Sequence, residues 1–164
     1  IKIKEFFSLT CGHCSNFHIK TLPQLKKKYI DTGKVQLEFI DYPLDRLAVI
    51  AATLARSIPT KDGYVEAVSI LLKKQKQWAY SKNPLNELQS IAKLFGISSK
   101  KFNDISQNIP LMQEIVTKME KESKNFDINS TPTFIVNDKY KISGALSFKD
   151  FEKELLKSIN AKKS

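Results

Sequence analysis

The first seven residues alternate between the two faces of a predicted β-strand. One face carries Ile1, Ile3 and Phe7 together with Glu5, and the other carries two lysines and a phenylalanine. A period of two is the signature of a strand, so the aliphatic face is expected to be buried. Glu5 stands where an uncharged residue would be expected, which favours a special role for its carboxyl group.

A helical pattern follows, and then a second run of buried-strand type. Phe17 indicates a buried side for the helix, Pro23 should kink or restart it, and Gly33 is expected to end it. Residues 35–44 (VQLEFIDYPL) then predict a buried strand. Residues 1–44 therefore predict a β-α-β unit, whose two strands run parallel with a right-handed crossover.

The middle of the chain is predicted to be helical, from residue 45 to about residue 123. Alanine and leucine are frequent there, apolar positions recur at helical spacing, and Asn83 followed by Pro84 predicts a capped helix start. The end of the chain returns to strands: TPTFIVND (131–138) alternates into a turn, KYKISG continues a hairpin, and a final amphipathic helix follows. The order is β-α-β, a helical block, then β-β-α, which is a mixed α/β class.

Composition limits the functional classes. The chain has 164 residues, of which 41% are hydrophobic, so it can bury a core without a disulfide. Its net charge of +10 comes almost entirely from lysines spread along the chain, whereas a nucleic-acid module would more often carry a clustered patch with arginines, so we expect no nucleic-acid partner. No apolar run is long enough to span a membrane and no signal peptide is visible. Because the chain begins with Ile1 inside a strand pattern, we interpret it as a processed or trimmed product.

The only two cysteines and the only two histidines of the chain lie between residues 11 and 18. Three explanations compete: a structural disulfide, a metal site and a redox-active dithiol. A disulfide between Cys11 and Cys14 would close almost the shortest loop that exists, which stabilises little. A zinc ion could recruit His18 on the same helix face, but no second C-x-x-C motif completes the site, and His13 lies between the cysteines. We therefore predict no metal.

The dithiol explains more of the pattern. Cys11 is predicted where a strand ends and a helix begins, so the helix N-terminus should stabilise its thiolate. His13 adds a positive charge or a donor beside it. We expect Cys11 to be exposed and nucleophilic, and Cys14, one turn further along, to be shielded and placed to resolve a mixed disulfide.

Pro132 is a second feature, independent of the cysteines. It opens a predicted strand among small residues, where its missing N–H is tolerated. A cis bond after Thr131 would expose the backbone of residue 131 to an extended peptide, but spacing alone leaves cis and trans open.

Several segments together resemble the DsbA-like branch of the thioredoxin superfamily, notably its alphaproteobacterial members. The similar segments include EFFSLTCGHC at the start, QKQWA in the helical block and STPTFIVND with ISG near the end. The resemblance implies a thioredoxin fold with an inserted helical domain. In this reading residues 1–44 and 124–164 form the thioredoxin-like domain, and residues 45–123 form the insertion.

The resemblance also implies roles for single residues. Cys11 becomes the attacking cysteine, Cys14 the resolving cysteine, His13 the group that tunes their acidity, and Glu5 the buried acid that assists proton transfer with Cys14.

On the substrate side, Pro132 becomes the cis-proline beside the dithiol, and Thr131 contacts the substrate backbone. Gly12 is counted with them as a substrate-contacting residue. The dipeptide Gly12-His13 is that of protein disulfide isomerases, whereas many DsbA proteins have Pro-His, so the oxidising strength stays open.

The implied function is a thiol–disulfide oxidoreductase that introduces disulfide bonds into secreted or periplasmic proteins without a cofactor. Its partners would be reduced or misoxidised protein substrates and a membrane redox partner, either a quinone-linked oxidase or a reductase. It would work in the periplasm or another extracytoplasmic space, and an absent N-terminal segment could anchor it or form oligomers. The alternatives are an isomerase or reductase of the same fold, and a non-catalytic peptide-binding or holdase module.

Overall fold

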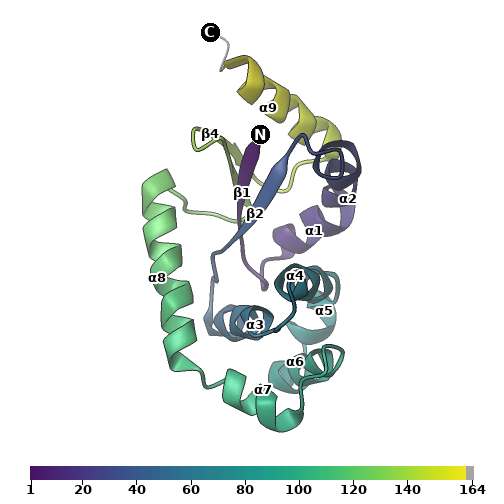
Figure 1. Cartoon of the computed structure of the whole chain (residues 1–164), viewed down its shortest axis with the longest axis vertical. Helices are drawn as coiled ribbons and strands as arrows, with labels where there is room; N and C mark the ends of the chain where they lie inside the picture. Colours follow the sequence, from purple (N-terminus) through teal and green to yellow (C-terminus); the bar gives the residue numbers. More distant parts are fainter. Residues whose placement is uncertain (162–164) are drawn as a thin grey trace.

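A four-stranded mixed sheet forms the centre of the computed structural model, which describes residues 1–161 (Figure 1). The strands are β1 (Lys2–Phe7), β2 (Gln36–Asp41), β3 (Thr133–Val136) and β4 (Tyr140–Ser143). They lie in the order β2-β1-β3-β4. β1 pairs with β2 in parallel and with β3 antiparallel, and β3 and β4 form a hairpin. The predicted β-α-β unit and C-terminal hairpin are both confirmed.

One face of the sheet is covered by helices from both ends of the chain. They are α1 (Gly12–Lys20), α2 (Leu22–Leu25), the π-helical turn η1 (Lys26–Ile30) and α9 (Phe148–Ala161). Phe17 of α1 and Phe151 of α9 pack on Phe134 of β3, with ring centroids 4.6 and 4.9 Å from that of Phe134. This aromatic cluster ties the two terminal segments together across the sheet.

The opposite face is covered by the end of α8 (Ile109–Phe126), which returns from the helical block along the side of the sheet (Figure 1). Phe6 of β1 contacts Phe126 edge to face, at 6.2 Å between ring centroids. β1 is thus buried on both faces. The helix runs to Phe126 instead of ending near residue 123, and Asp127 ends it in a left-handed conformation with φ of 50°. An aspartate in this conformation is a weaker sequence signal than the usual glycine.

The helical block lies beyond the carboxyl ends of β1 and β2, and its helix α4 (Gly63–Lys73) lies next to the start of α1 (Figure 1). Its other helices are α3 (Arg46–Arg56), α5 (Gln75–Trp78), α6 (Pro84–Lys93) and α7 (Ser99–Ile105). Trp78 is completely buried and its indole N–H donates to the Leu71 carbonyl at 2.8 Å. Asn83 is the N-cap residue of α6 and Pro84 begins the helix, as predicted, although the Asn83 side chain makes no capping hydrogen bond. Among the described residues, no helix has both the length and the apolar character that crossing a bilayer requires.

Candidate active site

The end of β1 places Cys11 at the N-terminus of α1. After Phe7 the chain makes a tight turn, in which the Cys11 N–H donates to the Ser8 carbonyl at 3.1 Å. Cys11 is extended, with φ of −82° and ψ of 118°, and it is the N-cap of α1. Its Sγ accepts a hydrogen bond from the Cys14 backbone N–H at 3.4 Å. A sulfur therefore occupies the capping position that a serine or aspartate oxygen normally fills.

The two thiols differ in their access to solvent. Cys14 is fully buried, whereas Cys11 retains 7% of its surface, and Gly12 and His13 between them are exposed. Cys11 is thus less exposed than the sequence predicted. The Thr131 carbonyl lies 3.6 Å from Sγ, so a segment from the other end of the chain covers part of the sulfur.

The surroundings shift the pKa values of the two thiols in opposite directions. A hydrogen bond from the Cys14 thiol, with others from Thr131 and from the backbone N–H groups of Cys14 and His13, outweighs burial and lowers the pKa of Cys11 from 9.0 to about 5. Burial, followed by the hydrogen bond with Cys11 and its negative charge, raises the pKa of Cys14 far above its usual range. At neutral pH the pair therefore holds one thiolate, on Cys11, and one thiol, on Cys14.

The Thr131–Pro132 segment reaches the dithiol from the start of β3. The peptide bond between these residues is cis, the form implied by the family resemblance. The segment is fixed on both sides: the Thr133 hydroxyl donates to the Ser130 carbonyl at 2.8 Å, and the Gly144 N–H donates to the Pro132 carbonyl at 2.9 Å. Residues from the two ends of the chain thus meet at one sulfur.

Glu5 lies at the middle of β1, completely buried, with Phe39 and Phe134 as its neighbours on the adjacent strands. Its carboxylate oxygens lie 2.9 and 3.1 Å from Nε2 of His18, which is also buried. His18 is the residue that the zinc alternative needed as a third ligand, and here it pairs with Glu5 instead. Sequence reasoning missed the Glu5–His18 pair. The only signal was the four-residue step from Cys14 to His18, which places these two residues on one side of α1.

Gln75 of α5 is a second residue that sequence reasoning missed. Its side-chain amide is buried, and Nε2 donates to the carbonyls of Leu9 and Cys11, both at 2.8 Å. The only signal was its place in QKQWA, a segment that contributed to the family resemblance without suggesting a role.

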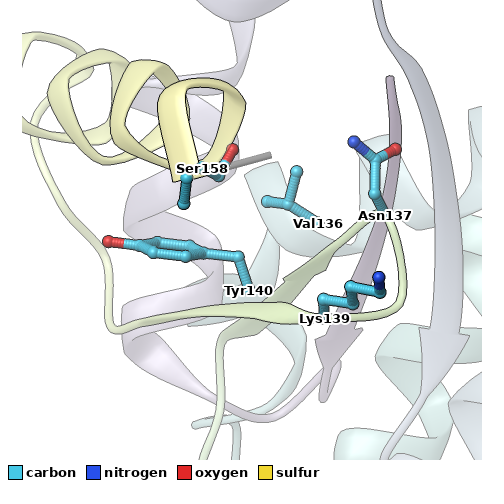
Figure 2. Close-up of a pocket in the computed structure, with 6 residues that line it drawn as sticks. Val136, Asn137, Lys139, Tyr140 and Ser158 are labelled. Atoms are coloured by element: carbon cyan, nitrogen blue, oxygen red, sulfur yellow. The ribbon is translucent and has the colours of Figure 1, made fainter. Parts of the chain in front are cut away.

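A separate pocket of about 440 Å³ lies at the turn between β3 and β4, against α9. Figure 2 shows Asn137 and Lys139 at this turn, and Tyr140 with Ser158 on the side of α9. None of its lining residues belongs to the dithiol loop or to the Thr131–Pro132 segment. The dithiol is therefore the better candidate for the chemical centre.

Comparison with known proteins agrees with this geometry. A family model described as thioredoxin matches residues 1–157. A Rickettsia typhi protein named as a protein-disulfide oxidoreductase is 31% identical over 135 residues, which are 82% of this chain and 50% of the relative. The chain thus spans about half the length of the Rickettsia relatives that it matches. A disulfide bond formation protein D of Bacillus anthracis is 27% identical over 98% of this chain and 72% of its own length.

Among solved structures, Wolbachia pipientis alpha-DsbA1 superposes with a TM-score of 0.84 at 30% identity, covering 95% of this chain and 84% of the Wolbachia chain. Chlamydia trachomatis DsbA superposes with a TM-score of 0.79 at 20% identity, over 99% and 87% of the two chains, which supports the fold alone. The sheet, the helical insertion and the C-x-x-C at the start of α1 agree with these likenesses. The chain belongs to the thioredoxin family, in its DsbA-like branch.

Proposed function

We propose that this chain is a thiol–disulfide oxidoreductase that donates a disulfide to reduced protein substrates. The observation that carries the proposal is the contrast between the two thiols: Cys11 sits at a helix N-terminus with a lowered pKa, and Cys14 is buried with a raised one. A sulfur that is stable as a thiolate is a good leaving group, and a shielded thiol nearby can resolve an intermediate.

The first step of the cycle is attack by a substrate thiolate on Sγ of Cys11 in the oxidised protein. The Cys11–Cys14 bond breaks, a bond forms between the substrate sulfur and Cys11, and Cys14 takes the electron pair. Because burial disfavours a Cys14 thiolate, Cys14 must gain a proton. Glu5 is the buried acid proposed to relay this proton from the substrate thiols to Cys14, and once the proton has been passed on, the negative charge of Glu5 is among the causes that raise the pKa of Cys14.

In the second step, another thiolate of the substrate attacks the substrate sulfur of the mixed disulfide. Cys11 leaves as a thiolate and the substrate disulfide forms. The substrate has lost two electrons and two protons, and the dithiol has gained two electrons and one proton, with the remaining proton released to solvent. The proposed roles of Thr131, Pro132 and Gly12 are to hold the substrate backbone beside Cys11, which agrees with the contact between Thr131 and Sγ. His13 is proposed to tune the acidity of Cys11 through its exposed side chain and its backbone N–H.

The direction follows from linkage. Whatever stabilises the Cys11 thiolate acts only after the disulfide has opened, so it favours the reduced form and raises the reduction potential. This supports an oxidant over a reductase. Such an oxidant would work in the periplasm or another oxidising extracytoplasmic space and would be re-oxidised by a membrane partner, for which a quinone-linked oxidase is the proposed class.

Gly12 favours a second candidate function, which also uses thiol–disulfide exchange. The Gly-His dipeptide resembles that of protein disulfide isomerases, which suggests an intermediate potential and an isomerase or reductase role.

The test is to mix the oxidised protein with a reduced peptide that contains two cysteines and to follow the peptide's loss of two hydrogens by mass. We expect stoichiometric oxidation of the peptide, and greater resistance to denaturant for the reduced protein than for the oxidised protein. A more stable oxidised form would reverse the direction and favour the reductase. Binding of the peptide without any exchange would indicate a binding module instead.

A further inference from the structure

Side-chain hydrogen bonds hold the turn that carries Cys11 at three places. The Ser8 hydroxyl accepts from the Leu44 N–H at 3.2 Å, and the Thr10 hydroxyl donates to Asp45 at 2.9 Å. Both of these ties lead to the loop after β2. The third contact is made by Gln75, and it is the only one of these three that reaches a cysteine.

Gln75 makes its two bonds with a single nitrogen. Nε2 has two hydrogens, and it donates one bond to the Leu9 carbonyl and one to the Cys11 carbonyl, each at 2.8 Å. The side chain is 1% exposed, so water does not substitute for these donors. The two carbonyls lie on either side of Thr10, and a single amide therefore fixes the curvature of the turn.

This curvature decides where the sulfur of Cys11 lies. The Cys11 carbonyl also accepts the Ser15 N–H at 3.2 Å, which is the first hydrogen bond of α1. Its orientation is thus set by the helix and by Gln75 together. Sγ of Cys11 accepts the Cys14 N–H. A rotation of the peptide group that contains the Cys11 carbonyl would therefore move the sulfur away from the helix N-terminus.

We propose that Gln75 is a positioning residue for disulfide exchange, through which the helical insertion holds Cys11 at the N-terminus of α1. A second bond between the same parts supports this: the Ser15 hydroxyl donates to the Leu72 carbonyl of α4 at 2.6 Å. Trp78, one turn after Gln75, is fully buried and anchors α5 in the core of the insertion. The inference deepens the proposed function, because it concerns the reactivity of the thiol to which that function assigns the exchange.

The test compares Gln75→Met with Gln77→Met in the full chain. Gln75→Met keeps the length of the side chain and removes both donors without adding charge. Gln77 is exposed on the same short helix, so its variant is the matched control. The ionisation of Cys11 is followed by thiolate absorbance as pH is varied, and the reduction potential is measured by equilibration with glutathione.

We expect Gln75→Met to raise the pKa of Cys11 by about one unit, since the thiolate then loses part of its backbone hydrogen bonding. At neutral pH this weakens the preference for the reduced form about tenfold, which lowers the reduction potential by about 30 mV. Gln77→Met should titrate like the unchanged protein.

Gln75→Asn serves as the second variant, because it keeps the amide but is one carbon too short to reach both carbonyls. Unchanged titration and potential in the folded variants would overturn the proposal. Loss of folding in both would also overturn it, because Gln75 would then be a requirement of the fold. Failure of the proposed function would be seen in a different measurement: the unchanged protein itself would not oxidise the dithiol peptide.

Discussion

Nε2 of His18 lies within hydrogen-bond distance of both carboxylate oxygens of Glu5, and both side chains are buried. The imidazole is enclosed by Phe7, Phe17 and Phe39, with ring centroids 6.1, 5.9 and 5.3 Å away. A carboxyl group in such apolar surroundings depends on its hydrogen-bonding partner, since removing one member of a buried pair leaves the other without compensation.

We therefore expect His18→Phe to lower the free energy of unfolding by about 3 kcal/mol, although its ring fits the aromatic surroundings. Adding Glu5→Leu should recover most of this loss, because the unpaired carboxyl group is then gone. Denaturant unfolding of both single variants and the double variant measures the coupling. The control is His13→Phe at the exposed histidine, compared in the oxidised protein, in which Cys11 carries no charge; it should change stability by less than about 0.5 kcal/mol. Equal losses in His18→Phe and in the double variant would contradict a Glu5–His18 coupling.

The stability of the reduced protein should rise with pH in the acidic to neutral range. The folded pKa of Cys11 is lowered from 9.0 to about 5, so its contribution is fully present above the unfolded pKa and is lost as pH falls through about 5. Between these values the unfolded chain holds a proton on Cys11 that the folded chain has released.

Denaturant unfolding under reducing conditions measures this effect between about pH 5.5 and 8, a range that lies between the folded and the unfolded pKa of Cys11. Cys11→Ser is the control. The reduced protein should gain up to about 1.4 kcal/mol per pH unit more than the control. Parallel pH profiles for the two proteins would mean that Cys11 is not an unusual acid.

Replacing each cysteine should separate the roles of the two sulfurs. Cys14→Ser leaves the partly accessible Cys11 without its resolving partner, so mixed disulfides with substrate should accumulate and be visible on non-reducing gels. Cys11→Ser leaves only a fully buried thiol and should trap almost none. Equal trapping by the two variants would reverse the assignment.

Two glycines at the first positions of helices should respond in opposite ways to a larger residue. Gly12 begins α1, and a Cβ there would meet only the Tyr80 hydroxyl, at the ordinary contact distance of 3.5 Å. The extended conformation of Cys11 also suits a residue before proline. We expect Gly12→Pro to stabilise the fold by about 0.5–1 kcal/mol.

Gly63 begins α4, and a Cβ there would lie 2.2 Å from Cγ2 of Ile58. Gly63→Ala should therefore destabilise the protein by about 1–3 kcal/mol. Thermal unfolding of both variants decides the matter, and a stable Gly63→Ala protein would show that the turn before α4 can move aside.

The order of strands and helices could be predicted from local patterns, because alternation in β1, helical spacing in the middle and the turn before β4 are properties of neighbouring residues. The burial of Glu5 could be predicted for the same reason, because Glu5 lies on the aliphatic face of the β1 pattern. The extension of α8 to Phe126 was not, since an aspartate in a left-handed conformation is an uncommon helix end.

The finer features of the site depend on packing between distant segments, for which the sequence carries no local signal. Gln75 lies 64 residues from the carbonyl of Cys11 that it contacts. The Thr131 carbonyl that contacts the Cys11 sulfur comes from the start of β3, and the pairing of Glu5 with His18 depends on how α1 lies on the sheet. The cis bond before Pro132 was implied by family resemblance, whereas proline spacing alone could not distinguish it from trans.

The contact between Cys11 and the Thr131 carbonyl joins residues 120 positions apart. A chain made or exported from its N-terminus presents the C-x-x-C helix long before β3 emerges. Until then β1 lacks its antiparallel neighbour, and nothing from the C-terminal segment covers the sulfur. The hydrogen bond from Thr131 that helps to lower the pKa of Cys11 therefore forms only when β3 has joined the sheet, whereas the contributions of Cys14 and of the start of α1 are local.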